Sequence, residues 1–282
     1  MRSWKNSQNN HQALAFCGGS FVEAVHTAIE FFKYLATAKT RHGIHSPFVY
    51  NFLEEVLYSQ KEFYVFDELF EKRKQLRSDP STIEVTDFGA GSRAGLTKTR
   101  SLSGIAKKGS PDKKFLKLLF KIAHYYDSKN ILELGTSLGI STSFLASAHS
   151  KSKVVTIEGC PQTAKIAQQT FDDLKLCNIE LIVGQFDEKL DSALTENGPF
   201  DLIYIDGNHR EEATVHYFEQ IEKHAAKEAI FILDDIYWSA GMTRAWEKIK
   251  GHKNVSVTLD LFRMGIVFTG VKTPRYDYRF RF

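Results

Sequence analysis

From Asn130 onward, short apolar runs alternate with longer stretches in which apolar residues recur every three or four positions. Short apolar runs are typical of buried strands, and the longer spacing predicts amphipathic helices. The predicted strands are Asn130–Leu134, Lys153–Glu158, Ile179–Val183, Leu202–Asp206 and Ala229–Asp234. The predicted helices are Ser141–Ala148, Pro161–Leu174, Glu188–Leu194, Glu211–His224 and Gly241–Ile249. This alternation predicts a doubly wound, Rossmann-like α/β fold, with a mostly parallel sheet covered on both faces.

The two ends of this alternating series carry different signals. Ser110-Pro111 predicts the start of a helix before the first strand, because serine caps helices well and proline fits the first turn. The apolar runs Val255–Leu261 and Gly265–Thr269 follow one another without a helix between them. They predict an antiparallel hairpin at an edge of the sheet, which brings the expected number of strands to seven.

The first 110 residues follow another pattern. Residues 1–20 are polar and predict a loose tail, whereas Phe21–Leu35, Phe48–Tyr58 and Lys61–Leu76 have helical spacing. Residues 87–110 break the periodicity with glycine, serine, lysine and arginine, which indicates a lid segment. We therefore expect a helical cap and lid over residues 1–110 and the ligand-binding domain over residues 111–282.

Composition narrows the class of protein only slightly. With 282 residues, 43% hydrophobic content and a net charge of +3, the chain is an ordinary globular protein whose charge does not require nucleic acid. No apolar run approaches the ~20 residues of a membrane helix, and the N-terminus lacks a signal-peptide pattern. Cys17, Cys160 and Cys177 form no CxxC spacing, which disfavours zinc or a disulfide framework. We expect a cytoplasmic protein that does not associate with membranes.

The turn after Asn130–Leu134 is the first candidate site. Its glycines permit bare backbone to face a ligand at the carboxyl edge, where doubly wound sheets bind ligands. Glu158 ends the next predicted strand and can accept hydrogen bonds from ribose hydroxyls, as it would in a nicotinamide-binding fold. The glycine spacing is G-x-x-x-G instead of G-x-G-x-x-G, so a pyrophosphate cradle is incomplete. Glu133 would repel a pyrophosphate but suits the cationic amino acid end of S-adenosylmethionine, which favours a methyl donor.

Five segments in order strengthen this interpretation: ILELGTSLGIS, TIEG, IVGQFDE, DLIYIDGNH and FILDDI. They resemble the successive motifs of class I S-adenosylmethionine-dependent methyltransferases, and among these the small-molecule O-methyltransferases related to catechol O-methyltransferase. The resemblance spans roughly residues 111–272, with Ser137 where the usual motif has its middle glycine. It implies S-adenosyl-L-methionine as cofactor. The implied cofactor-binding residues are Glu133, Gly135, Thr136, Ser137, Gly139 and Ser141 at the methionine end, Glu158 and Gly159 at the ribose, Gly184, Gln185 and Phe186 at the adenine, and Asp206.

Three carboxylates close two neighbouring predicted strands. Asp206 ends one strand and Asp234 and Asp235 follow the next, so a parallel sheet would bring them to one edge. Hard oxygen ligands suit Mg²⁺ or Mn²⁺, and the set matches the metal triad of the catechol-type enzymes, with Asp235 where those often carry asparagine. The alternatives are a helix-capping pair and, for Asp206, contact with the cofactor.

His209 follows Asp206 by three residues and is a candidate general base, with Asp206 as the second candidate catalytic residue. Its alternative role is to stack near the adenine or to cap the next helix. The predicted lid also carries five basic residues that could attract an anionic acceptor, or could form a solvated basic loop: Arg93, Lys98, Arg100, Lys107 and Lys108.

The leading hypothesis is O-methylation of a small hydroxylated molecule. Methylation of a nucleic acid base usually requires Asn/Asp-Pro-Pro-aromatic after the fourth strand, where this chain has Asp-Gly-Asn-His, and no ribose-methylating tetrad can be placed. A third alternative is a non-catalytic interaction protein that keeps the cofactor. We expect a small-molecule acceptor and no nucleic acid partner, and the sequence leaves a homodimer open.

Overall fold

The computed structural model describes residues 21–40, 44–87 and 96–282. The predicted tail 1–20, with Cys17, and the basic residue Arg93 lie outside the described residues. Cys160 and Cys177 are free thiols.

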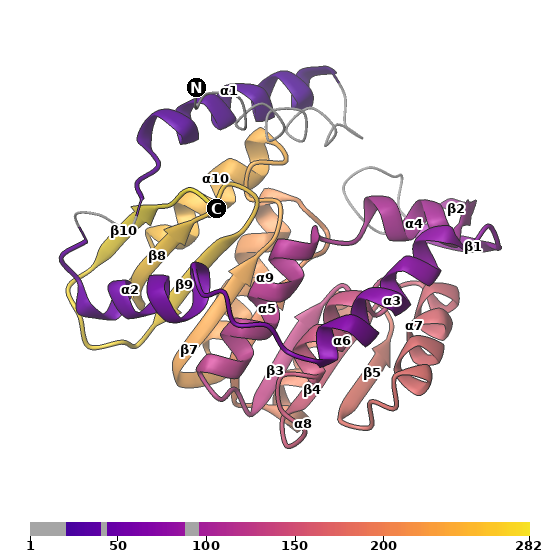
Figure 1. Ribbon diagram of the computed structural model, residues 1–282. Helices are drawn as coiled ribbons and strands as arrows, with labels where there is room; N and C mark the ends of the chain where they lie inside the picture. Colours follow the sequence, from indigo (N-terminus) through magenta and orange to yellow (C-terminus); the bar gives the residue numbers. More distant parts are fainter. Residues whose placement is uncertain (1–20, 41–43, 88–95) are drawn as a thin grey trace, which may run out of the picture.

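The central feature is one sheet of eight strands (Figure 1). In spatial order the strands are β10 (Tyr276–Arg279), β8 (Val255–Asp260), β9 (Gly265–Thr269), β7 (Ala225–Leu233), β6 (Phe200–Ile205), β3 (Asn130–Leu134), β4 (Lys153–Glu158) and β5 (Ile179–Val183). Only β9 runs against the common direction, because it pairs antiparallel with both β7 and β8. The predicted Rossmann-like fold with an antiparallel hairpin is confirmed.

The predicted strand number is one too low. The C-terminal strand β10 pairs parallel with β8 and forms the edge of the sheet, so the hairpin β8–β9 lies one strand inside it. Tyr276, Tyr278 and Phe280 alternate along this segment, and their successive ring centroids are 5.6 and 5.5 Å apart. Alternation of aromatic and polar residues fits a half-buried strand, which explains why this segment joins the sheet.

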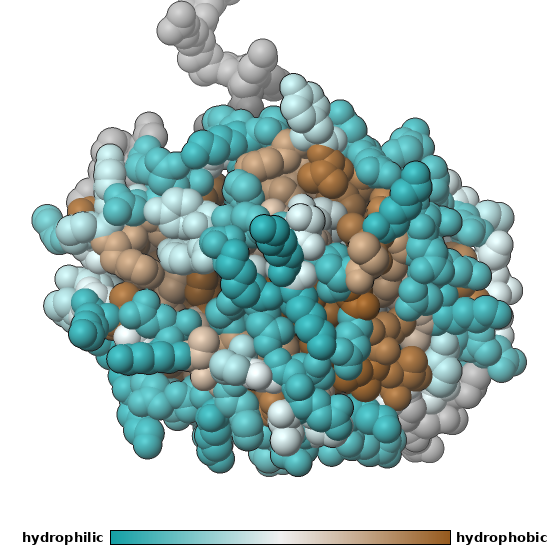
Figure 2. Space-filling model, turned by 90° about the horizontal axis from the view of Figure 1, so that it is seen from below, coloured by the Kyte–Doolittle hydropathy of each residue, from teal (hydrophilic) through white to brown (hydrophobic). Residues whose placement is uncertain are grey.

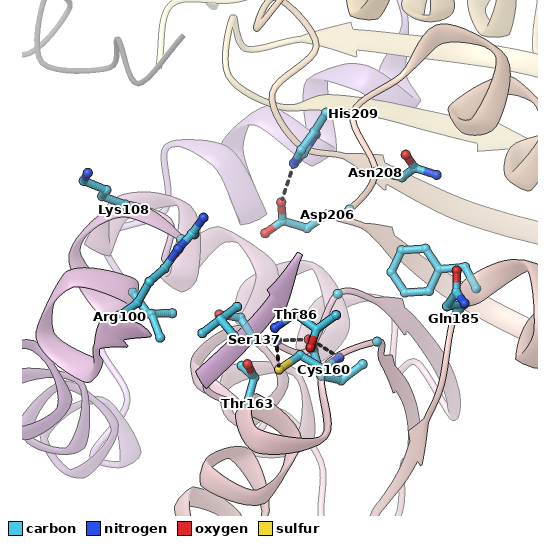
Figure 3. A pocket seen from close by; sticks show the side chains of 18 of the residues that line it. Thr86, Arg100, Lys108, Ser137, Cys160, Thr163, Gln185, Asp206, Asn208 and His209 are labelled. Atoms are coloured by element: carbon cyan, nitrogen blue, oxygen red, sulfur yellow. Dashed lines mark hydrogen bonds and ion pairs between the residues drawn. The ribbon is translucent and has the colours of Figure 1, made fainter. Parts of the chain in front are cut away.

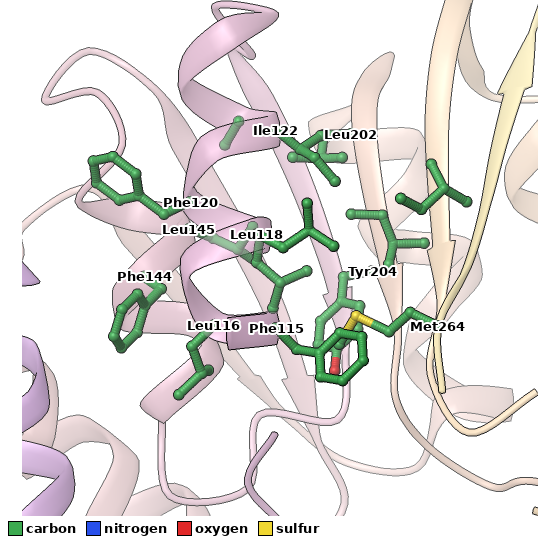
Figure 4. Packing of buried hydrophobic residues seen from close by; sticks show 14 of the residues in the cluster. Phe115, Leu116, Leu118, Phe120, Ile122, Phe144, Leu145, Leu202, Tyr204 and Met264 are labelled. Atoms are coloured by element: carbon green, nitrogen blue, oxygen red, sulfur yellow. The ribbon is translucent and has the colours of Figure 1, made fainter. Parts of the chain in front are cut away.

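Helices cover both faces of the sheet. They are α5 (Lys113–Tyr125), α6 (Ile140–Ala146), α7 (Pro161–Asp173), α8 (Phe186–Asn197), α9 (Glu211–Glu222) and α10 (Ala240–Lys250). Alternate strand residues feed two hydrophobic clusters, one shared with α5 and α6 and the other with α8, α9 and α10. Figure 4 shows the first cluster, in which α5 lays Phe115 and Leu118 toward Tyr204 and Met264.

The start of α5 differs from the prediction. The helix begins at Lys113 after Asp112, two residues later than Ser110-Pro111 predicts. The Ser110 hydroxyl instead accepts a hydrogen bond from Nε of Arg73 at 3.3 Å, and the Pro111 carbonyl accepts one from Nη2 of Arg73 at 3.0 Å. These two hydrogen bonds are buried. They hold Ser110 and Pro111 against Arg73, so Ser110 does not cap the helix.

The N-terminal elements are α1 (Phe21–Thr37), α2 (Pro47–Phe52), the π-helical turn η2 (Leu53–Leu57), α3 (Val65–Ser78), β1 (Thr82–Asp87), β2 (Leu96–Ser101) and α4 (Leu102–Lys108). Residues 96–108 of the predicted lid segment thus form a strand and a helix, and their role as a lid stays a prediction. β2 pairs antiparallel with β1, and α4 packs against α3 and buries Leu102 and Ala106. Buried residues of α2 and η2 share the hydrophobic cluster of α5. The domain boundary at residue 110 stays a prediction.

The face of the molecule that is seen from below is largely polar (Figure 2). Seen from below in Figure 2, hydrophilic side chains cover most of the molecule and hydrophobic ones occupy smaller areas. None of the helices in the described part of the chain has the length and apolar character of a membrane span.

Candidate active site

The site lies where the chain reverses its direction across the sheet. After β3 the chain builds β4 and β5 on one side and then returns to place β6 on the other side of β3. Doubly wound sheets bind ligands at the carboxyl ends of the strands at such a switch point. A cavity of about 920 Å³ opens there (Figure 3), and residues from β1, β2 and α4 form its opposite wall.

The turn after β3 brings bare backbone to this cavity. Gly135 has φ +104°, and a Cβ at this position would lie 2.1 Å from the carbonyl oxygen of Asp206. Ser137 also has a positive φ, +49°, and its N–H donates to Oε2 of Glu158 at 2.8 Å. The glycine therefore allows the β3 turn to lie directly against the end of β6.

Glu158 closes β4 at the edge of the cavity. Its second oxygen, Oε1, accepts the Cys160 N–H at 2.9 Å. Burial raises the pKa of Glu158 to about 7, although the backbone donors oppose this shift. Each carboxylate oxygen keeps a further lone pair, so the group can still accept hydrogen bonds from a bound hydroxyl.

Glu133 is fully buried beneath the turn and does not line the cavity. Its carboxylate accepts hydrogen bonds from the hydroxyls of Ser141 at 2.6 Å, Thr142, and Thr156 at 2.7 Å. Burial raises the pKa of Glu133, and the three hydroxyls oppose this rise. Glu133 therefore fixes the start of α6 to β3 and β4, and its contact with a cofactor stays a prediction.

The other residues assigned to the cofactor fall into three groups. The main cavity is lined by Gly135, Ser137, Glu158, Gly159, Gln185, Phe186 and Asp206. A smaller adjoining cavity, which shares Gly109 and Ser137 with the first, is lined by Thr136 and Ser141. Gly139 and Gly184 line neither, but both have positive φ, +79° and +149°, and shape the turns behind the cavity.

The wall formed by β1, β2 and α4 could not be predicted from the sequence. The Thr86 N–H donates to Sγ of Cys160 at 3.4 Å, which joins β1 to the segment after Glu158. Arg100 and Lys108 of the predicted lid line the cavity, together with Arg210. Arg100 and Lys108 thus place positive charge on the wall opposite the carboxylates at the strand ends, whereas Arg210 follows His209 at the start of α9.

The three carboxylates do gather at one edge, as the sequence predicts. The Tyr204 hydroxyl lies between two of them, 3.1 Å from Oδ2 of Asp206 and 3.3 Å from Oδ2 of Asp234. Burial and the neighbouring carboxylates raise the pKa of Asp206 well above its usual range. Burial and Asp234 raise the pKa of Asp235.

An arginine that the sequence analysis missed completes this cluster. Arg263, in the turn between β8 and β9, donates from Nε and Nη2 to the two oxygens of Asp234, both at 3.0 Å. Its Nε also lies 3.6 Å from Oδ1 of Asp235. No local pattern around Arg263 marks it, because it meets Asp234 only through the pairing of β9 with β7.

His209 lies at the mouth of the same cavity. Its Nε2 is 3.6 Å from Oδ1 of Asp206, and both residues line the cavity. Asn208 and His209 have positive φ, +65° and +29°, which is rare for residues with side chains. The Asn208 amide donates to the Tyr217 hydroxyl at 2.9 Å and thereby holds this loop to α9. A strained loop that presents an imidazole to a cavity is typical of functional sites.

Comparison with known proteins agrees with this arrangement. A family model described as a methyltransferase domain matches residues 132–236. A catechol O-methyltransferase of Niastella koreensis is 38% identical over 98 residues, 34% of this chain and 43% of that protein. A catechol O-methyltransferase of Mycobacterium tuberculosis is 31% identical over 129 residues, 45% of this chain and 56% of that protein. The chain thus spans about half the length of these curated relatives.

The solved structures agree on the fold. The O-methyltransferase TomG of Streptomyces achromogenes, involved in tomaymycin synthesis and solved in complex with SAM, has a TM-score of 0.53 to this chain at 19% identity. The match covers 78% of this chain and 94% of TomG. Residues 132–236 are therefore similar to a methyltransferase domain, and the fold of the chain is similar to that of TomG. The family resemblance that the sequence motifs predict is confirmed.

Proposed function

We propose that this protein transfers a methyl group from S-adenosylmethionine to a hydroxyl group of a small molecule. The observation that carries the proposal is that the Gly135 turn, Glu158 and the Asp206–His209 pair all face one cavity of about 920 Å³. A cavity of this size has room for a nucleoside cofactor and a small acceptor together. The catechol O-methyltransferase relatives support transfer to oxygen.

The placement of the cofactor follows from the walls of the cavity. Glu158 would accept hydrogen bonds from the ribose hydroxyls, and Gln185 and Phe186 would border the adenine. The Gly135 turn and Ser137 would lie against the amino acid end, next to the smaller cavity that Thr136 and Ser141 line. Asp206 would then lie between the cofactor and His209.

The protein's own task is to orient the acceptor and take up its proton. S-adenosylmethionine supplies a methyl group on a good leaving group, so alignment contributes most to the rate. His209 would accept the hydroxyl proton while the oxygen–carbon bond forms and the carbon–sulfur bond breaks. Asp206, 3.6 Å from Nε2, would orient the imidazole and stabilise its charged form.

The carboxylates that the sequence assigned to Mg²⁺ or Mn²⁺ do not fit that role as they stand. Both oxygens of Asp234 accept hydrogen bonds from Arg263, and one of them also accepts the Tyr204 hydroxyl. In the described part of the chain, no group of three or more histidine, cysteine or acidic residues is arranged to hold a metal. We therefore assign no step to a cation.

The basic wall of the cavity suggests which acceptors fit. Arg100 and Lys108 line this wall and Arg210 lines the cavity next to His209, and their charges favour an acceptor that carries a carboxylate or phosphate. We therefore propose a small anionic hydroxylated acceptor. The cytoplasmic location and the homodimer stay predictions.

A methyl-transfer screen tests the proposed function. Labelled S-adenosylmethionine would be offered with neutral diols, sugars, carboxylated or phosphorylated diols, and RNA, each with EDTA or with Mg²⁺. Turnover that is highest with the anionic small molecules supports the proposal. Methylation of RNA alone would replace it with the nucleic acid alternative. Binding of S-adenosylhomocysteine without any turnover would favour the non-catalytic alternative.

His209→Ala is the matching prediction at the site. Loss of the proposed base should lower kcat by roughly 10²–10⁴-fold, while the affinity for S-adenosylhomocysteine changes little. Single-turnover kinetics and calorimetric titration measure the two effects. His216→Ala, on the exposed side of α9, is the control and should match the wild type. If affinity fell and turnover did not, His209 would be a cofactor contact and not the base.

A further inference from the structure

The acidic cluster already contains a buried positive charge. The Arg263 side chain is 11% exposed and the Asp234 side chain 0%. The two form a planar, bidentate pair, which is the strongest common geometry for this kind of ion pair. Arg263 also lies 3.6 Å from Asp235, so one guanidinium contacts two of the three carboxylates that a divalent cation would need.

The lone pairs of Asp234 are largely used by these contacts. Its Oδ2 accepts both Nη2 of Arg263 at 3.0 Å and the Tyr204 hydroxyl at 3.3 Å, and its Oδ1 accepts Nε of Arg263 at 3.0 Å. Mg²⁺ and Mn²⁺ would have to approach these oxygens to about 2.1 Å. An ion at that distance would face a guanidinium that cannot lose its proton to relieve the repulsion.

The fold also holds Arg263 in place. Its turn is closed by the Leu261 N–H on the Met264 carbonyl and the Arg263 N–H on the Leu261 carbonyl, both at 2.9 Å. The Ile236 N–H donates to the Arg263 carbonyl at 3.2 Å, so the turn is fastened to the segment that follows Asp234 and Asp235. The guanidinium carbon lies 6.0 Å from the ring centroid of Phe115, which limits its movement on the remaining side.

We propose that the Arg263 guanidinium permanently occupies the place of a divalent cation among Asp206, Asp234 and Asp235, so that this methyltransferase domain works without a metal. Arg263 acts here as a positioning residue, because it does not line the cavity. It neutralises Asp234 and holds this carboxylate in place. Asp234 and Asp206 both contact the Tyr204 hydroxyl, so Arg263 acts on Asp206 through these two residues. That Arg263 excludes a cation follows from the contacts of this chain and does not depend on any activity. That methyl transfer needs no metal rests on the proposed function.

Titration with Mn²⁺, followed by electron paramagnetic resonance of the free ion, tests the proposal on the full-length protein stripped with EDTA. We expect the wild type to bind no Mn²⁺ at submillimolar concentrations. Arg263→Met keeps the length of the apolar stem and removes the charge, and it should bind one Mn²⁺ per chain. Asp234→Asn added to this variant should abolish the binding. Arg279→Gln, which breaks the comparable buried pair with Asp260, is the control and should behave as the wild type.

Two results would overturn the proposal. One is stoichiometric Mn²⁺ binding by the wild type that Asp234→Asn removes, because the arginine would then give way to the ion. The other is a folded Arg263→Met, judged by circular dichroism, that gains no ion. If Arg263→Met does not fold, the wild-type titration can still overturn the proposal, and it does not depend on turnover. Where the methyl-transfer screen finds an acceptor, wild-type turnover should be equal in EDTA and in Mg²⁺.

Discussion

Gly135 has a backbone conformation and a neighbour that exclude a side chain. Its φ is +104°, and a Cβ would lie 2.1 Å from the Asp206 carbonyl oxygen. Gly135→Ala should therefore push the β3 turn away from β6, lower the free energy of unfolding by about 3 kcal/mol, and weaken binding of S-adenosylhomocysteine. Urea unfolding and calorimetric titration measure the two effects.

Gly241 provides the control for this substitution. It lies in α10, where a Cβ would meet its nearest atom at 3.6 Å. Gly241→Ala should leave stability unchanged or raise it slightly, by up to about 1 kcal/mol. If Gly135→Ala and Gly241→Ala had the same stability and the same affinity for S-adenosylhomocysteine, the close contact at Gly135 would not determine the shape of the site.

Glu158 gives a pH dependence whose sign can be worked out. Burial raises its pKa to about 7, whereas glutamate in an unfolded chain titrates near ~4.3. The stability that the folded-state proton contributes is fully present below about pH 4 and is lost as the pH rises through about 7. The wild type without cofactor should therefore lose stability between about pH 5 and pH 7, and Glu158→Gln should lack this part of the slope. Urea unfolding at several pH values measures it, and parallel profiles would contradict the assignment.

The same residue should couple cofactor binding to proton release. Ribose hydroxyls donate to the charged carboxylate, so binding favours the deprotonated form. The affinity of the wild type for S-adenosylhomocysteine should therefore rise with pH up to about 7, and Glu158→Gln should remove this component. Calorimetry in buffers of different ionisation enthalpy counts the released protons directly.

At the scale of elements, the sequence predicts the first three strands of the alternating series best. The bounds of β3, β4 and β5 match the predicted runs, because each is a short apolar segment bounded by polar residues. The N-terminal hairpin was missed because β1 alternates apolar and polar residues over only six positions and its partner β2 lies within a basic stretch. Such a strand is stable only through its partner and the helices it meets, and a linear pattern does not contain that information.

The same reasoning separates the site residues that were predictable from those that were not. Residues at strand ends, such as Glu158 and Asp206, could be placed because parallel strands bring their carboxyl ends to one edge. The direction of the Glu133 side chain could not, because it depends on three hydroxyls from α6 and β4. The role of Arg263 could not be predicted either. Arg263 lies in the turn between β8 and β9, and this turn comes close to Asp234 only when the hairpin has formed and paired with β7.

At the scale of the whole molecule, the first and last described segments meet at the edge of the sheet farthest from β5. The Tyr34 hydroxyl of α1 donates to the Phe280 carbonyl, and the Lys39 N–H donates to the Arg279 carbonyl at 2.8 Å. Figure 1 shows α1 above this edge, near β10. Nε of Arg279 donates in turn to Asp260 at 2.7 Å, at the end of β8. The C-terminal residues thus link α1 to the sheet that carries the site.

A substitution at Phe280 would weaken the link between α1 and the sheet at a position far from the cavity. Its side chain is 0% exposed, and it belongs to the hydrophobic cluster that α5 shares with the sheet. Phe280→Ala should lower the free energy of unfolding by about 3–5 kcal/mol, measured by urea unfolding. Tyr64→Ala, at a side chain 99% exposed, should change it by less than about 0.5 kcal/mol. Because β8, β9 and β7 separate β10 from β6, the folded Phe280→Ala should keep the wild-type affinity for S-adenosylhomocysteine. A folded variant with lost affinity would mean that the sheet edge and the cofactor site are energetically coupled.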